Sequence, residues 1–275
     1  MKHALLVRLV RALQNKEKGF LLLDTHAGRG RYDLAAASTG DSLVRKPEWP
    51  DGIGRLAQCS DLPAGLEEYA ALVRDFDRRA GNSGDVPQFY PGSPALAQAL
   101  ARPQDRLVFC EKQPDEWAKL RDEFLFSPGA EVRETDGYAA IRALLPPPER
   151  RALVLIDPPF EAQDEFAQIA RAVGEGLRRF ASGVLAVWYP LTERARVEEF
   201  FEAVRRLQPP PTLAAELSIA GPGSLIKLKG CGLLVINPPW QFDHEAGALL
   251  KFLGPVLAQA PGGGERLEWL VRESS

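Results

Sequence analysis

The sequence predicts an α/β fold with a doubly wound, mostly parallel sheet and a small helical insertion after the first strand. From about residue 93 onward, short apolar runs alternate with amphipathic segments, the pattern of a parallel sheet covered by helices on both faces. A polar segment rich in glycine and proline interrupts the pattern at 35–92. The chain has 275 residues, 45% of them hydrophobic, enough for one large domain with a sizeable core.

The chain opens with an amphipathic helix followed by a buried strand. Residues 2–15 repeat apolar side chains at helical spacing, with one face formed by Leu6, Leu9, Val10 and Leu13. Arginines interrupt this apolar run, so it does not have the pattern of a signal peptide. The strand that follows ends at Asp24 and breaks into a loop that contains glycines.

The interrupting segment divides the chain into two expected units. We expect residues 1–34 and 93–275 to form the main domain, and residues 35–92 to form an inserted helical subdomain with one clear helix near 63–80. The main domain resumes with a helix for which Ser93 is the expected N-cap, because a proline follows it at the first helical position.

Seven further strands follow, most of them separated by helices. The expected strands are 106–111, 130–135, 152–157, 183–190, 212–220, 232–240 and 267–273. The clearest helices are 165–180, 193–207 and 245–259. Ligands of such sheets bind beyond the carboxyl ends of the strands, so the chemistry is expected there.

Composition and charge exclude several classes of protein. A net charge of −3 argues against a strongly basic nucleic-acid coat protein but leaves room for a local basic cleft. No apolar run approaches the roughly 20 residues of a membrane span. Cys59, Cys110 and Cys231 lie far apart without metal-ligand spacing, so we expect reduced thiols in a cytoplasmic protein and no metal site. We also expect a monomer.

The loop after the first strand carries two glycines that suit a nucleotide-like ligand. Gly28 and Gly30 would let the backbone approach such a ligand closely, but Asp33 occupies the place of the third glycine of a dinucleotide fingerprint. A ligand without a pyrophosphate, such as S-adenosylmethionine, does not need that third glycine. A plain tight turn between strand and helix is an equal interpretation of this loop alone.

The next two strands end in acidic residues. Glu111 could accept hydrogen bonds from both hydroxyls of a ribose, although a solvated surface glutamate is the better interpretation of this residue alone. Asp136 could accept from the amino group of an adenine, and a simple aspartate–glycine turn with Gly137 is equally plausible.

The strand "LVLIDPPF" ends in the most informative motif. Proline holds the residue before it extended, so Asp157 and Pro158 form a stiff turn that presents a carboxylate and a backbone carbonyl side by side. Two acceptors can bind both hydrogens of an aromatic amine and free its lone pair for attack on a methyl sulfonium, while Phe160 stacks on the base. We favour this interpretation over a merely structural Pro-Pro turn.

A second version of the motif, "INPPW", ends a later strand. Asn237 could also accept from an amino hydrogen, but no adenosine-binding residues lead into this strand. The order of the glycine loop, Glu111, Asp136 and the first motif along the chain favours Asp157. We therefore expect the segment from Asn237 to Trp240 to be a wall of the substrate site or structural.

These motifs resemble class I methyltransferases that act on amino nitrogens. More closely, over nearly the whole chain, they resemble the bacterial 23S ribosomal RNA adenine-N6 methyltransferase J family. The similar stretches are "LDTHAGRGRY", "FYPGSP", "DGY", "LVLIDPPF", "LAVWYP" and "VINPPW". The resemblance implies a Rossmann-like methyltransferase sheet, S-adenosylmethionine as cofactor and 23S ribosomal RNA as partner. It also implies that Asp157 is the catalytic acceptor and that the cofactor contacts are made by His3, His26, Gly28, Ser93, Glu111, Asp136, Gly137 and Asp157.

Two features depart from the family pattern. The family carries a tail with Tyr-Arg-His and His-Ala-Gly-Asn stretches before a Lys-His pair, whereas this sequence starts with that pair, Lys2 and His3, directly after Met1. If the tail covers cofactor or RNA, weak binding or poor turnover is expected. Phe160 takes the place of a common tyrosine, which preserves stacking and removes a hydroxyl.

The leading hypothesis is therefore transfer of a methyl group to adenine N6 in 23S ribosomal RNA, with the target base out of its stack. Alternatives are a methyltransferase for DNA adenine or ribosomal RNA guanine, a non-catalytic adenosine- or RNA-binding module, and, less favoured, a nicotinamide dehydrogenase. Basic segments could bind phosphates, although each is more often a solvated face: Arg78-Arg79, Arg178-Arg179, Arg205-Arg206 and 227–230.

Overall fold

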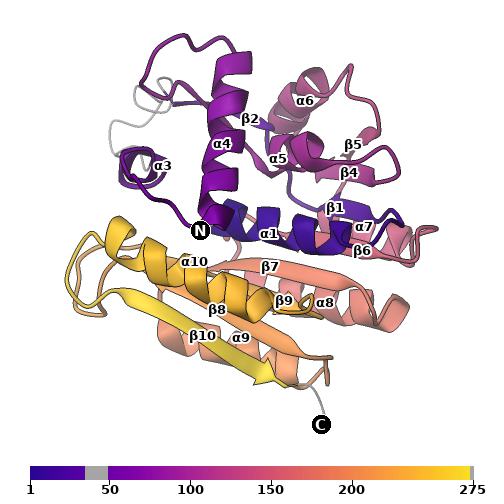
Figure 1. The fold of residues 1–275 in the computed structure, drawn as a ribbon. Helices are drawn as coiled ribbons and strands as arrows, with labels where there is room; N and C mark the ends of the chain where they lie inside the picture. The colour runs from indigo at the N-terminus through magenta and orange to yellow at the C-terminus, as the bar shows by residue number, and fades with distance from the viewer. Residues whose placement is uncertain (35–48, 273–275) are drawn as a thin grey trace.

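The computed structural model describes residues 1–34 and 49–272, and its centre is an eight-stranded sheet (Figure 1). The strands are β1 Leu21–Asp24, β4 Arg106–Glu111, β5 Ala130–Glu134, β6 Ala152–Ile156, β7 Val184–Pro190, β8 Thr212–Ser218, β9 Gly230–Ile236 and β10 Gly264–Val271. Their order across the sheet is β10-β8-β9-β7-β6-β1-β4-β5. Each expected strand of the main sheet is therefore present.

The strand directions confirm a mostly parallel sheet. Strands β5, β4, β1, β6 and β7 run parallel to one another. Strand β9 runs antiparallel to β7, β8 antiparallel to β9, and β10 antiparallel to β8. As a result, β1, β4, β5, β6, β7 and β8 end at one edge of the sheet, and β9 and β10 end at the opposite edge.

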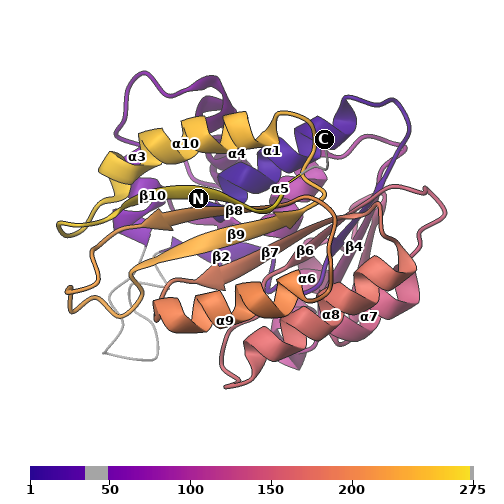
Figure 2. The same ribbon diagram turned by 90° about the horizontal axis from the view of Figure 1, so that it is seen from below.

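Helices cover both faces of the sheet, as Figure 2 shows. They are α1 Lys2–Gln14, α3 Ile53–Leu56, α4 Ala64–Arg79, α5 Ser93–Leu100, α6 Pro114–Glu123, α7 Gly137–Leu144, α8 Glu165–Arg179, α9 Arg194–Arg205 and α10 Phe242–Leu257, with a 3₁₀ helix at Trp49–Asp51. Helices α1, α4, α5 and α10 pack in one core and α7, α8 and α9 in the other. The doubly wound fold is thereby confirmed.

Strand β6 shows why the sequences of the central strands are continuous apolar runs. Leu153 and Leu155 point into the core of α1 and α10, while Val154 and Ile156 point into the core of α7, α8 and α9. Side chains alternate between the two faces of a strand, so a strand buried on both faces needs apolar residues at every position. The first polar residue after such a run lies at the edge of the sheet.

The segment after β1 adds a second, smaller sheet. Strand β2, Arg31–Asp33, pairs antiparallel with β3, Phe89–Pro91, and α4 confirms the helix expected near 63–80. Helix α4 lies against α1 and α10. The sequence did not predict the β2–β3 pair, because two three-residue strands carry no periodic signal. The division of the chain at 34 and 93 stays a prediction.

Helix α5 begins one residue earlier than expected. Gly92 is the N-cap and Ser93 is the first helical residue, so the prediction that Ser93 is the N-cap is wrong. The physical reason is docking of the preceding backbone: the Gly92 amide donates to the Gly30 carbonyl at 2.7 Å, and a Cβ at Gly92 would lie 3.0 Å from that oxygen. Only glycine fits there comfortably.

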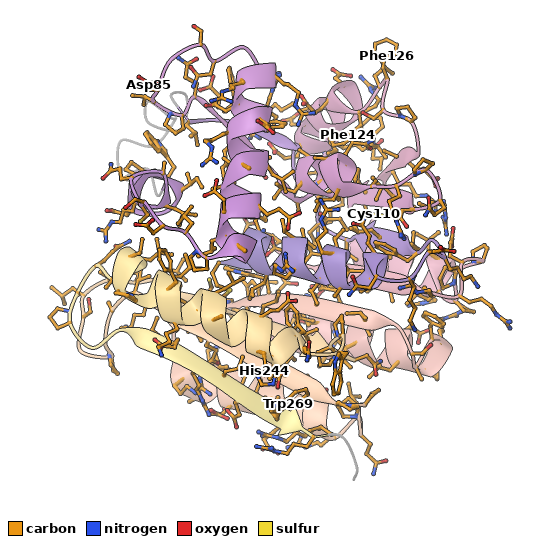
Figure 3. All side chains as sticks on the ribbon, viewed as in Figure 1. Asp85, Cys110, Phe124, Phe126, His244 and Trp269 are labelled. Carbon is orange, nitrogen blue, oxygen red and sulfur yellow. The ribbon has the colours of Figure 1, made fainter. Side chains whose placement is uncertain are left out.

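Within residues 1–34 and 49–272, no helix is long and apolar enough to cross a membrane. Cys59, Cys110 and Cys231 are free thiols. Cys110, labelled in Figure 3, lies on β4 and is buried.

Candidate active site

The loops that follow β1, β4, β5 and β6 meet at one edge of the sheet. Asp24 lies level with Phe109 of β4 and Leu155 of β6, and Glu111 lies level with Glu134 of β5. The parallel register therefore brings together strand ends that are far apart in sequence. This edge is where α/β sheets bind their ligands.

The glycine loop folds back onto Glu111. Gly28 and Gly30 have positive φ angles of 60° and 75°, which glycine adopts without strain. The Gly28 amide donates to Oε2 of Glu111 at 2.9 Å, and the Gln113 amide donates to Oε1 at 2.8 Å. Glu111 is only 8% exposed, so the interpretation of a solvated surface glutamate is wrong. Each carboxylate oxygen keeps a lone pair that could accept from a ligand hydroxyl.

Asp136 and Gly137 start helix α7 beside the glycine loop. Asp136 is the N-cap, and its Oδ1 accepts from the Ala139 amide at 2.9 Å. Its other carboxylate oxygen has no hydrogen bond within the described residues. A Cβ at Gly137 would lie 1.9 Å from the Thr25 carbonyl oxygen, so only glycine allows this close approach of helix and loop.

Asp24 is a buried carboxylate that sequence reasoning did not select. It is 0% exposed, and its Oδ1 accepts from the His26 amide at 3.3 Å, while Oδ2 has no hydrogen-bond partner in the described part of the chain. Burial raises the pKa of Asp24 to about 6, although Ser93 and Lys2 favour its charged form. Its signal in the sequence was an aspartate that ends an apolar run directly before the glycine loop.

Asp157 forms an ion pair with Lys2 at the start of α1. The Lys2 ammonium donates to Oδ2 of Asp157, and the two side chains are only 22% and 16% exposed. Burial opposes the charge on Lys2, but the Asp157 carboxylate outweighs it and raises the pKa of the lysine. The sequence pointed to Lys2 only as a member of a Lys-His pair, so its contact with Asp157 was missed.

Phe160 has an unusual backbone conformation, and its ring lies among aromatic side chains. Its φ angle is 54°, uncommon for a residue with a bulky side chain. Its ring makes edge-to-face contacts with Phe166, at 5.1 Å between centroids, and with Trp188, at 5.6 Å. Pro158 before it is buried. The Trp188 contact, which fixes the ring of Phe160, was not predicted.

His26 lies in the glycine loop with a defined protonation state. The Thr25 hydroxyl donates its one proton to the Leu155 carbonyl at 2.9 Å, so Nδ1 of His26, 2.8 Å from that hydroxyl, must be the donor to it. Burial lowers the pKa of His26 to about 4, and its ring contacts Tyr138 edge-on at 5.0 Å. His26 is therefore neutral near pH 7 and offers Nε2 as an acceptor.

The second motif lies at the other edge of the sheet. Ile236 of β9 pairs with Leu185 near the start of β7, so Asn237 lies away from Asp157. The Asn237 amide donates to the carbonyls of Ala181 and Gly183 at 2.7 and 2.9 Å. Asn237 thus stabilises the turn before β7. This favours a structural role for Asn237 over a role in the wall of the substrate site.

The basic segments differ in their partners. Most arginines of the three pairs are engaged by carboxylates, in the ion pairs Arg78–Asp75, Arg178–Glu175, Arg179–Glu175 and Arg205–Glu202. Lys227 and Lys229 have no carboxylate partner in the regions that the structure describes, and they lie in the loop between β8 and β9 at the same edge as Asp157. No group of three or more metal-ligating side chains occurs among the described residues.

The sequence is similar to those of known ribosomal RNA methyltransferases. The family model "Ribosomal RNA large subunit methyltransferase D, RlmJ" matches residues 17–271. Two proteins named ribosomal RNA large subunit methyltransferase J, from Escherichia coli strain K12 and Haemophilus influenzae, are 36% and 34% identical over 99% of this chain and 94% of their own length. A crystal structure of a Legionella pneumophila protein superposes with a TM-score of 0.86 at 33% identity, covering 98% of this chain and 95% of that one. This chain therefore belongs to the ribosomal RNA large subunit methyltransferase J family.

Proposed function

We propose that this protein, acting in the cytoplasm, transfers a methyl group from S-adenosylmethionine to N6 of an adenine in 23S ribosomal RNA. Membership of the family supports methyl transfer to large-subunit ribosomal RNA. The observation that carries the choice of an amino nitrogen is the position of the Asp157-Pro158 turn directly after β6, at the ligand-binding edge. Such a turn offers a carboxylate and a backbone carbonyl as acceptors.

The residues at this edge fit the cofactor. Glu111 is buried and keeps acceptor capacity for ribose hydroxyls. Gly137 lets the start of α7 pack directly on the Thr25 carbonyl, which keeps Asp136 beside the glycine loop. Nε2 of His3 is buried without a partner within the described ranges, as expected of an atom that meets a ligand. The residues that would hold the cofactor are His3, His26, Gly28, Ser93, Glu111, Asp136, Gly137 and Asp157. When bound, S-adenosylmethionine supplies an electrophilic methyl group on a positively charged sulfur.

The residues after β6 would orient the amino group. Asp157 and the Pro158 carbonyl accept its two hydrogens, which aims the nitrogen lone pair at the methyl carbon. Phe160, held edge-on by Phe166 and Trp188, stacks on the base. Asp157 is then the first acceptor for the proton that the nitrogen releases as it gains the methyl group. A carboxylate has about four lone-pair sites, so Lys2 can stay bound to Asp157 meanwhile.

The loop between β8 and β9 supplies a surface for the RNA. The Leu191 amide donates to the Gly230 carbonyl at 2.9 Å and the Lys229 amide donates to the Leu191 carbonyl at 3.2 Å, which hold the loop against the end of β7. Lys227 and Lys229 stand here without a carboxylate partner, as far as the described chain shows, so they can bind phosphates on either side of an extruded base. Two lysines without a carboxylate partner among the described residues, at the edge where Asp157 lies, favour RNA over a small-molecule amine as the substrate.

The test is methyl transfer from labelled S-adenosylmethionine to an unmodified 23S ribosomal RNA transcript, followed by nucleoside analysis. We expect N6-methyladenosine as the product. Duplex DNA and single-stranded DNA of the same sequence should receive little label. Methylated guanine, or preferential labelling of DNA, would favour the alternative substrates. Cofactor binding without any transfer would favour a non-catalytic module.

A further inference from the structure

Three side chains from separate segments form a chain of hydrogen bonds behind the active site. The hydroxyls of Tyr69, on α4, and Tyr90, on β3, lie 2.7 Å apart. The Tyr90 hydroxyl lies 2.7 Å from Nδ1 of His3, in the first turn of α1, and the two rings stack with centroids 5.5 Å apart. His3 directly follows Lys2, the residue that forms the ion pair with Asp157. This hydrogen-bond network therefore reaches the sheet edge where Asp157 lies.

The number of protons on the two hydroxyls and on the neutral His3 ring determines which atom donates in each hydrogen bond. If Tyr69 donates to Tyr90 and Tyr90 donates to Nδ1 of His3, both hydroxyl protons are used and Nε2 of His3 carries the remaining proton. If Nδ1 of His3 instead donates to Tyr90, one hydroxyl proton is left without an acceptor, because the described residues offer no other acceptor to either tyrosine. Buried donors without acceptors are costly, so the first arrangement is favoured.

The protonation states agree with this count. Burial raises the pKa of Tyr69 to about 12 and that of Tyr90 well above its usual value, so both keep their protons near pH 7. Burial and the neighbouring Lys2 charge lower the pKa of His3 well below its usual value, so His3 is neutral and carries one ring proton.

We propose that Tyr90, supported by Tyr69, fixes His3 as the tautomer protonated on Nε2, so that His3 donates a hydrogen bond to an acceptor atom of the bound cofactor. Tyr69 and Tyr90 are thus positioning residues. The proposal rests on the proposed function for the identity of that ligand. His26 has the opposite tautomer, since its Nδ1 must donate to Thr25, so the site offers one histidine donor and one histidine acceptor.

Nitrogen NMR of histidine-labelled protein tests the tautomers directly, because the sequence has three histidines and the third, His244, is exposed on α10 (Figure 3). The His3 and His26 signals are assigned by their loss in His3→Gln and His26→Gln. In the free parent protein we expect His3 protonated on Nε2 and His26 protonated on Nδ1. Tyr90→Phe keeps the stacked ring and should leave the His3 tautomer mixed. Tyr69→Phe is the matched control and should preserve it, because Tyr90 still donates to Nδ1.

Calorimetric titration with S-adenosylhomocysteine provides the second readout. Tyr90→Phe should weaken binding about tenfold, as expected for loss of one oriented hydrogen bond, and Tyr69→Phe should weaken it less. A parent His3 protonated on Nδ1 would overturn the proposal even if Tyr90→Phe does not fold. So would a Tyr90→Phe variant with unchanged tautomer and affinity. Absence of S-adenosylhomocysteine binding by the parent would overturn both the cofactor contact and the proposed function. The tautomers of the free protein would still test whether Tyr90 and Tyr69 orient His3.

Discussion

Replacing Asp24 by asparagine should stabilise the protein at neutral pH and have little effect in acid. Asp24 is fully buried at the end of β1, and one of its carboxylate oxygens has no partner within the described residues. Burial raises its pKa to about 6 from an ordinary value of 3.8. Asparagine has nearly the same shape, can still accept from the His26 amide and carries no charge to bury.

The magnitude follows from proton linkage. Between pH 3.8 and about 6, the folded protein holds a proton on Asp24 that the unfolded chain has released, so stability falls as pH rises through this window. Each pKa unit corresponds to about 1.4 kcal/mol, so the charged carboxylate costs about 3 kcal/mol once pH exceeds the folded pKa. Asp24→Asn should recover this amount above the window and none below it. A cost of this size is typical of a residue retained for function.

The assay is urea unfolding of the parent and Asp24→Asn at about pH 4 and about pH 7.5. The free energy of unfolding of the variant should exceed that of the parent by about 3 kcal/mol at the higher pH and by little at the lower. The matched control is Asp136→Asn, which also removes a carboxylate. Asp136 is the exposed N-cap of α7, and asparagine is an equally good N-cap residue. A variant that is less stable at the higher pH, or equally stabilised at both, would refute this reasoning.

Three further predictions concern residues at the sheet edge where Asp157 lies. Lys2→Met leaves the Asp157 carboxylate without its counter-charge, and we expect the free energy of unfolding to fall by about 1–3 kcal/mol in chemical denaturation, since both side chains keep some exposure. Lys227→Ala with Lys229→Ala should raise the KM for RNA and reduce the salt dependence of RNA binding by about two counterions, without changing the affinity for S-adenosylhomocysteine. Gly137→Ala places a Cβ 1.9 Å from a carbonyl oxygen and should cost at least about 3 kcal/mol of stability, whereas a normal melting temperature would contradict the close approach described above.

The strands and their polar ends could be predicted from the sequence because both depend on local patterns. An apolar run buried on two faces ends where the chain reaches the sheet edge, so Asp157 and the glycine loop could be placed at the same edge from strand order alone. The face of α1 was predictable for the same reason: Leu6, Leu9 and Leu13 recur at helical spacing and are buried.

The contacts between these ends could not be predicted, because they depend on packing between distant segments. Lys2 and Asp157 are 155 residues apart, and no local pattern links them. The burial of Glu111 arises only when the glycine loop folds back and donates the Gly28 amide to it. The start of α5 shifted by one residue because the backbone of Gly92 docks on the loop, a tertiary contact that overrides local capping preference.

The central claim is that the Asp157 carboxylate holds and deprotonates the reacting amino group. The most direct measurement is the single-turnover rate of methyl transfer to 23S ribosomal RNA by Asp157→Ala and by the parent, each saturated with cofactor as verified by titration. We predict that the rate falls on the order of 10² to 10⁴-fold, because alanine can neither accept from the amino group nor take up its proton. A rate within about twofold of the parent, under the same saturation, would contradict this account.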